Sequence, residues 1–137
     1  MARDKIHDVF KKALEEEGWS VTDDPLFLKI GKIPIHIDLG AEKIIGAERN
    51  GERIAVEIKS FGITSLITAL YEAIGKFIVY RKALEVLKPD RVLFLAMPEA
   101  AYQQLSSEPI LQKMFVDEQI KLVLYNTESQ KVSKWIE

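Results

Sequence analysis

Residues 43–59, KIIGAERNGERIAVEIK, carry the clearest structural signal in the chain. Asn50-Gly51 separates two runs, Lys43 to Arg49 and Glu52 to Lys59, in which apolar and polar residues alternate. Alternation at every second residue is typical of a β-strand, and Asn-Gly between two such runs is the strongest short-range signal of a hairpin with a two-residue turn. We therefore expect an antiparallel pair of strands in which Arg49 opposes Glu52.

This register determines which charged residues of the hairpin meet. Glu48 opposes Arg53, which predicts a surface ion pair of small energetic value. That pair lies roughly 13 Å from Glu57 at the rise of a strand, whereas Glu42 opposes Lys59 near the other end. Successive side chains of a strand point to opposite faces. One face is therefore suited to the core and carries Ile54, Val56 and Ile58, and the other carries Arg53, Ala55, Glu57 and Lys59.

Helical and strand-like periodicities alternate on either side of the hairpin. Helices are expected over Lys5 to Glu17, Thr64 to Leu87 and about Ala100 to Phe115, with Thr64 or Ser65 as the N-cap of the second. Strands are expected over Leu26 to Ile30, Ile33 to Asp38, Arg91 to Met97 and Gln119 to Tyr125, with Trp135-Ile136 packing back onto the body. The sequence thus predicts a single α/β domain over residues 1–137, built as one mixed sheet flanked by helices.

The amino-acid composition indicates the compartment in which the protein works more clearly than it indicates the function. The 137 residues contain no cysteine, which excludes disulfides and cysteine nucleophiles and fits a reducing compartment, so we expect a cytoplasmic protein. No apolar run approaches the length that spans a bilayer, and no membrane association is expected. The formal net charge of −2 gives no overall attraction to nucleic acid, although a local basic surface would still provide one.

Acidic residues gather near the end of the predicted hairpin. The carboxylates of Asp38, Glu42 and Glu57 and the ammonium of Lys59 could converge there. Carboxylate oxygens suit Mg²⁺ or Mn²⁺, which in turn favours phosphate chemistry. Two plainer interpretations stay open: Glu57 and Lys59 could form an ion pair on a solvated strand face, and Asp38 could cap a turn. Glu42 is better suited to pair with Lys59 than to bind metal.

An acid followed after a gap by Glu57-Ile58-Lys59 resembles the PD-(D/E)xK phosphodiesterase signature, here with Asp38 as the first acid. That resemblance implies a restriction-endonuclease-like core with the element order αβββαβαβ. Over nearly the whole chain the sequence more specifically resembles the XisH family. The stretches that carry this likeness are Ile37 to Glu42, Ala55 to Phe61, Gly18-Trp19 and Lys134 to Ile136.

The family resemblance implies an excision controlling factor for a DNA element, working with an XisI-type partner protein. Two hypotheses follow: a Mg²⁺-dependent DNA endonuclease, and a catalytically inactive regulator that acts in recombination through its partner or DNA. In the first, Asp38, Glu57 and the Ile58 carbonyl would hold the metal, and Lys59 would activate water. Lys76 stands where related nucleases often carry glutamine, and with Tyr80 it would touch the substrate. A homodimer is expected, since cutting both strands of a duplex would use two sites.

Several other residues have more ordinary interpretations. The first helix should offer an acid near the site, and Glu15, Glu16 and Glu17 are candidates among which the sequence does not choose. His7 and His36 lack the spacing of a transition-metal motif and are interpreted as ordinary polar residues. Trp19 and Trp135 are expected to anchor the core or an interface.

Overall fold

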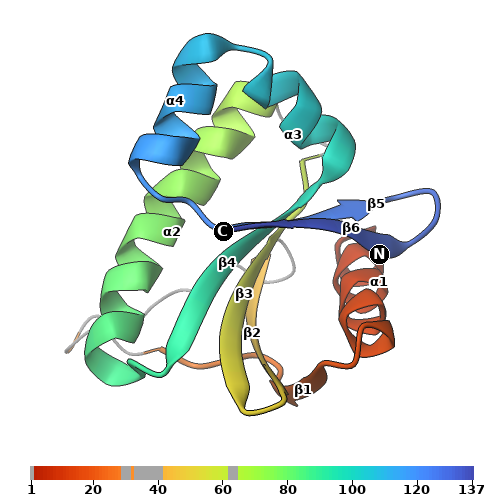
Figure 1. Ribbon diagram of the computed structural model, residues 1–137, viewed down its shortest axis with the longest axis vertical. Coiled ribbons are helices and arrows are strands. Elements are labelled where there is room, and N and C mark those ends of the chain that lie inside the picture. Colours follow the sequence, from red (N-terminus) through yellow and green to blue (C-terminus); the bar gives the residue numbers. More distant parts are fainter. Residues whose placement is uncertain (1, 29–31, 33–41, 62–64) are drawn as a thin grey trace.

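The computed structural model describes residues 2–28, 32, 42–61 and 65–137. Within these residues the chain forms a six-stranded sheet with the strands in sequence order, and helices lie on both of its faces (Figure 1). The strand pairs β3–β4 and β4–β5 are parallel and the other three pairs are antiparallel, so the sheet is mixed. The elements in chain order are α1 (Ala2–Glu16), β1 (Ser20–Asp23), β2 (Glu42–Arg49), β3 (Glu52–Lys59), α2 (Leu66–Leu87), β4 (Arg91–Pro98), α3 (Glu99–Ser106), α4 (Pro109–Asp117), β5 (Leu122–Asn126) and β6 (Lys131–Ile136).

The β2–β3 hairpin has the predicted register over its full length, from Glu42↔Lys59 to Arg49↔Glu52. Its turn residues, Asn50 and Gly51, have φ values of 53° and 82°. Two positive φ values in succession are what a type I′ turn requires, and its twist matches that of the flanking strands. The Asn-Gly dipeptide therefore fixes the pairing of the charged residues that follow.

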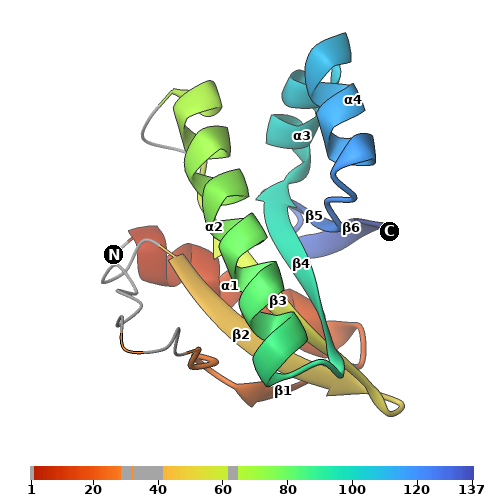
Figure 2. The same ribbon diagram turned by 90° about the vertical axis from the view of Figure 1, so that its left-hand side faces the viewer.

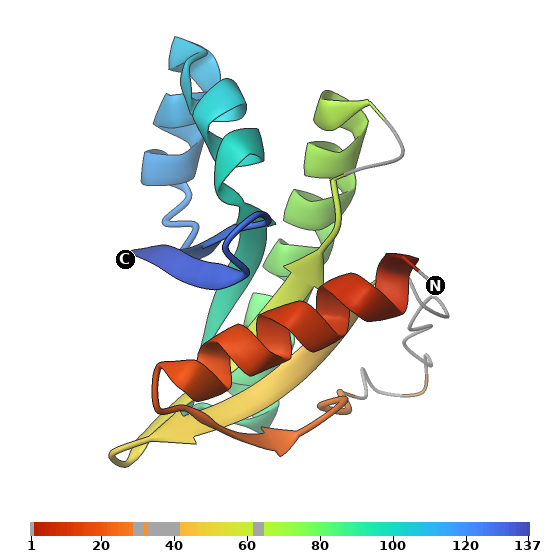
Figure 3. The same ribbon diagram turned by 90° about the vertical axis from the view of Figure 1, so that its right-hand side faces the viewer.

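The sheet has a hydrophobic core on each face, which explains why its central strands are apolar on both sides. α1 lies across one face, where its Phe10 and Leu14 pack against Ile54 and Val56 (Figure 3). The other face is covered by α2, α3 and α4 (Figure 2). Parallel strands joined by helices are buried in this way on both sides. The mixed α/β architecture predicted from the sequence is confirmed.

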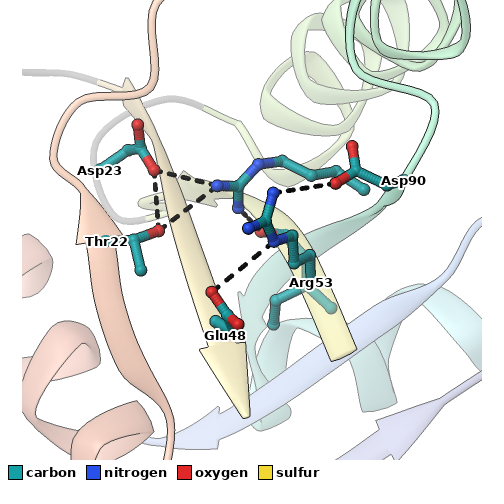
Figure 4. A network of polar contacts seen from close by, with 7 residues as sticks. Thr22, Asp23, Glu48, Arg53 and Asp90 are labelled. Carbon is teal, nitrogen blue, oxygen red and sulfur yellow. Dashed lines mark hydrogen bonds and ion pairs between the residues drawn. The ribbon is translucent and has the colours of Figure 1, made fainter. Parts of the chain in front are cut away.

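At the turn end of the hairpin, the contacts of two arginines link the four strands β1 to β4 (Figure 4). Arg91 donates to the Ile54 carbonyl at 2.8 Å and contacts Asp23 Oδ1 at 3.0 Å. Arg53 contacts Glu48 at 3.6 Å and Asp90 at 3.0 Å. The predicted Glu48–Arg53 surface pair is therefore present, at the opposite end of β3 from Lys59.

The element boundaries depart from prediction in four places. Ser20–Asp23, for which no strand was expected, is strand β1. Leu26 to Leu28, expected to begin a strand, is not one, although the Leu26 N–H donates to the Ile44 carbonyl at 2.7 Å. The helix expected over residues 100–115 is two helices, because Pro109 begins a new one after the break at Ser107 and Glu108. The C-terminal residues form a full strand, β6, paired with β5. Ile33 to Asp38 lies outside the described residues.

The long helix α2 is capped as expected at its start. The Ser65 hydroxyl accepts a hydrogen bond from the Thr68 backbone N–H at 3.2 Å, and Ser65 rather than Thr64 is the N-cap. The helix ends at Leu87, just before Lys88 and Pro89. Among the described parts of the chain, no helix is both long enough and apolar enough to cross a membrane.

Candidate active site

Glu57 and Lys59 are buried charged residues at the carboxyl end of the central strand β3. Glu57 is 0% exposed and Lys59 is 7% exposed. Charged side chains are almost never this buried unless they are paired or bind a ligand, because leaving water costs several kcal/mol per charge. In open α/β sheets, ligands bind beyond the carboxyl ends of the strands. The position and the burial of the two residues therefore both distinguish them from ordinary surface charges.

The burial overturns one of the plainer interpretations of these residues. A solvated strand face would leave Glu57 and Lys59 open to water, yet both are covered. The reason is that the face carrying them packs under helices: Ala55, the preceding residue of the same face, belongs to the core formed with Ala73, Phe77 and Tyr80 of α2. Alternation along β3 was predicted correctly, but the second face is interior as well.

Helix α2 carries polar groups at helical spacing, and the first of them reaches this end of β3. The Lys59 ammonium donates to Glu72 Oε2 at 3.1 Å. Lys76 and Tyr80 follow Glu72 at intervals of four residues, so they share its side of the helix and lie about 6 Å apart along the axis. Lys76 is half-buried and Tyr80 is 9% exposed. The structure thus places the predicted Lys76 and Tyr80 on the same side of α2 as the carboxylate that holds Lys59.

The remaining predicted metal ligands are not placed by the structure. Asp38 and His36 lie outside the described residues, and so does the side chain of Glu42, whose backbone pairs with Lys59. Among the side chains that are described, no three His, Asp or Glu residues group in a way that could hold a metal ion. The assignment of Asp38, Glu57 and Glu42 as metal ligands stays a prediction.

The acids at the end of α1 lie on the other face of the sheet and near the turn of the hairpin. Arg49, next to the turn, donates to the Glu17 carbonyl at 3.0 Å, and Glu17 Oε1 accepts from Trp135 Nε1 at 2.9 Å. The Glu15 and Glu16 side chains are exposed. Trp19 and Trp135 pack together at 5.8 Å between ring centroids, which confirms their expected role as anchors.

Two features of the molecule escaped sequence reasoning. Glu72 was not singled out, although a carboxylate one turn before Lys76 on the same helix side was the available signal. His7 is not an ordinary surface residue: it is 7% exposed, and its Nε2 lies 2.9 Å from Asp24 Oδ1. Burial would raise the pKa of Asp24, but the contacts with His7 and Lys11 outweigh it and hold that pKa below its usual value. No local pattern joins residues so far apart in sequence.

A mixed sheet with helices on both faces, carrying Glu-x-Lys at the carboxyl end of a central strand, defines an α/β protein of the nuclease-like class. The family can be stated more narrowly. The family model described as XisH protein matches residues 1–133. This chain belongs to the XisH family, as its sequence resemblance implied.

Two solved structures resemble the chain closely. One is an fdxN element excision controlling factor protein from Anabaena variabilis, with a TM-score of 0.89 and 38% identity over 98% of this chain and 99% of that chain. The other is an XisH family protein from Nostoc punctiforme, with a TM-score of 0.87 and 39% identity over 96% of this chain and 98% of that chain. A comparison with curated proteins found no match.

Proposed function

We propose that the protein is a DNA element excision controlling factor that acts as a Mg²⁺-dependent DNA phosphodiesterase, with its site at the carboxyl end of β3. The excision role is supported by family membership and by the description of the Anabaena variabilis relative as such a factor. The phosphodiesterase activity is supported chiefly by one observation, the burial of Glu57 and Lys59 on one face of a central strand.

Burial of these two residues argues for function because it costs stability. Apolar residues of similar size at a buried ion pair are often neutral or stabilise a protein by about 1–4 kcal/mol. Neighbouring positions on the same sheet face, such as Ala55 and Leu95, are filled with apolar side chains. A carboxylate and an ammonium two residues apart in that setting are costly groups to keep unless their chemistry is used.

The chemistry of the donors fits a hard divalent cation. Glu57 offers carboxylate oxygens and Ile58 a backbone carbonyl, and Asp38 would complete the set. When bound, Mg²⁺ or Mn²⁺ supplies positive charge that offsets the negative charge developing on a phosphoryl group. Lys59, held by Glu72 at 3.1 Å, would orient and activate the attacking water. Lys76 and Tyr80 would donate to the phosphate backbone of DNA.

A plasmid-nicking assay in Mg²⁺ or Mn²⁺ tests this activity. Near-isosteric variants, Glu57→Gln and Lys59→Met, are preferable to alanine because both positions are buried. The matched control is Glu48→Gln, which removes an equivalent charge from the neighbouring strand of the same hairpin. We expect metal-dependent nicking by the unmodified protein, at a rate that both site variants lower by at least about 100-fold. The rate of Glu48→Gln should stay within twofold of that of the unmodified protein.

Absence of nicking by folded protein would refute the phosphodiesterase, as would nicking that survives Glu57→Gln. Circular dichroism and thermal unfolding of each variant separate loss of chemistry from loss of fold. The same samples, tested by gel shift on duplex and single-stranded DNA, show whether binding persists where cleavage is lost. Lys76→Gln should weaken DNA binding, because the lysine would be a phosphate contact.

The second candidate is a catalytically inactive regulator that keeps the nuclease-like fold and acts through DNA or an XisI-type partner. The observation that favours it is the formal net charge of −2, since phosphate contacts with basic residues normally dominate DNA affinity. Under this alternative, Glu57→Gln would leave the control of excision in cells unchanged. Under the phosphodiesterase proposal, the same substitution would abolish that control while the protein stays folded.

A further inference from the structure

The outward side of α2 carries more large apolar residues than a surface helix normally does. Six large apolar residues of this helix are exposed, and Tyr71 and Val86 are 68% and 74% exposed. Glu72 and Arg81 lie at the flanks, where Glu72 contacts Lys59 and Arg81 donates to the carbonyls of the two residues that follow α4. On the outward side itself, Lys82 forms an ion pair with Glu85 at 2.8 Å. A helix that is apolar on both its inner and outer sides is suited to burial on both. The exposed apolar residues are Ile67, Tyr71, Ile78, Val79, Val86 and Leu87.

A glycine lies in the middle of this apolar side. Gly75 is exposed, and a Cβ placed on it would have no atom within 4 Å. Glycine in a helix interior costs roughly 1 kcal/mol relative to alanine. Among the described residues, no atom crowds the position that a Cβ at Gly75 would take. A notch at this point would let another helix approach closely.

We propose that a second copy of this chain binds to the outward side of α2, with the two α2 helices antiparallel about a twofold axis near residue 77. In that arrangement residue i of one helix faces residue 154 − i of the other. Val79 of one copy then fills the notch at Gly75 of the other. At the same time Lys82 faces Glu72, a pairing of opposite charges. Thr68 meets Val86, which is an uncharged pair.

Self-complementarity favours a second copy over an unrelated partner. The steric pair Gly75–Val79 and the charge pair Glu72–Lys82 are independent, yet both are satisfied by the same axis. Lys82 contacts Glu85 and Glu72 contacts Lys59 within the chain, and their side chains are 75% and 50% exposed, so each keeps a face open to a neighbour. Antiparallel packing also sets the helix dipoles in opposition, whereas parallel packing would align them.

The area available is enough for a dimer of modest affinity. A helix of 22 residues is about 33 Å long, and a strip of that length and one helix wide removes on the order of 600 Å² of accessible surface per copy. Specific interfaces begin at roughly this size. We therefore expect a dissociation constant on the order of 10 μM, so the dimer should be seen at high protein concentration and lost on dilution.

The dimer would connect the two candidate active sites. Glu72 is the carboxylate that holds Lys59, and in the proposed packing Lys82 of the second copy approaches the exposed part of the same carboxylate. The dimer proposal itself rests only on the surface of α2 and does not depend on nuclease activity. It gives a structural basis for the homodimer expected from the sequence.

Sedimentation velocity on the full chain from about 1 to 200 μM tests the dimer. The unmodified protein should pass from the mass of one chain to that of two, and Val79→Glu should weaken the dissociation constant by at least about 100-fold. The matched control is Val116→Glu on α4, where the valine is 63% exposed and outside the proposed contact. A protein that stays monomeric at 200 μM, or a dimer that Val79→Glu leaves intact, overturns the proposal.

Two further measurements test the orientation. Lys82→Glu should weaken the dimer about 10-fold, and adding Glu72→Lys in the same chain should restore it, because each copy then carries the swapped pair. The chain has no cysteine, so Val86→Cys accepts a single spin label. Antiparallel helices place the two labelled backbones about 27 Å apart along the axis, whereas parallel helices would place them about 10 Å apart. The shorter distance, or no rescue by the charge swap, contradicts the antiparallel arrangement.

Discussion

Gly46 lies in the middle of β2, beside the guanidinium of Arg91. A Cβ added at Gly46 would lie 2.7 Å from Arg91 Nη1 and 2.9 Å from Asp23 Oδ1, closer than real Cβ atoms come to other atoms. Arg91 cannot easily move away, because it is held by the Ile54 carbonyl and by Asp23. We therefore predict that Gly46→Ala loosens this network.

The expected cost follows from the contacts that would be strained. Hydrogen bonds to charged groups contribute about 1.5–3 kcal/mol each. The bond from Arg91 to the Ile54 carbonyl is 2.8 Å long, and the Arg91 side chain is only 9% exposed, so most of that contribution applies. The contact with Asp23, whose side chain is 38% exposed, counts for less. Alanine also gains about 0.5–1 kcal/mol over glycine in a strand. We expect a net loss of about 2 kcal/mol.

Urea unfolding followed by circular dichroism measures this loss, with the midpoint lowered and the slope unchanged. The decisive control is the double-mutant cycle with Arg91→Met. In that background the guanidinium is gone, and Gly46→Ala should cost nothing or slightly stabilise the protein. A Gly46→Ala variant as stable as the unmodified protein would refute the reasoning, as would a cost that persists in full beside Arg91→Met.

Three smaller predictions accompany this one. Phe77→Ala should lower the free energy of unfolding by about 3–5 kcal/mol, since the ring is 0% exposed, and urea unfolding with a smaller loss would contradict its place in the core. Gly75→Ala should raise the free energy of unfolding by about 0.5–1 kcal/mol in dilute protein, because the added methyl lies within 4 Å of no atom in the described part of the chain. The pKa of Asp24 is lowered from 3.8, so its stabilising contribution is present above about pH 4 and lost as the pH falls through the folded-state value. The free energy of unfolding, measured from pH 6 to 2.5, should therefore fall less steeply for Asp24→Asn than for the unmodified protein. An equal fall in both would exclude a stabilising role for the contacts of Asp24 with His7 and Lys11.

The parts of the fold predicted most accurately are those set by local chemistry. Asn50-Gly51 fixes its own turn, and the turn fixes every pair of the hairpin, so its register could be predicted residue by residue. Helix α2 and strand β4 were found within two residues of their observed ends, since each is a long periodic run followed by a clear stop. These elements are determined by residues close to one another in sequence.

The errors arose where distant residues decide the structure. Ser20–Asp23 is a strand because β2 lies beside it, not because its sequence alternates strongly. Likewise β6 depends on β5, and its pairing shifts register between Leu124 and Tyr125, which weakens the pattern. Pro109 was a local signal that was missed, since proline commonly begins a helix and here splits one predicted helix into two.

The candidate active site could be predicted only as far as local sequence determines it. Alternation placed Glu57 and Lys59 on one face of β3, but their burial depends on α2, which follows later in the chain. The contact between Lys59 and Glu72 joins residues 13 apart and could not be derived from spacing on a strand. The exposed apolar residues of α2 were not singled out either, because apolar residues on both sides of a helix weaken the contrast between its faces.

Titration calorimetry with Mn²⁺ tests most directly the claim that Glu57 stays in the core to hold a metal ion. We predict that the unmodified protein binds one ion per chain. Glu57→Gln should abolish this binding while thermal unfolding shows that it remains folded, and Glu48→Gln should bind as the unmodified protein does. Absence of binding heat in the unmodified protein, or equal binding by Glu57→Gln, would contradict the account and leave the buried carboxylate with a structural role.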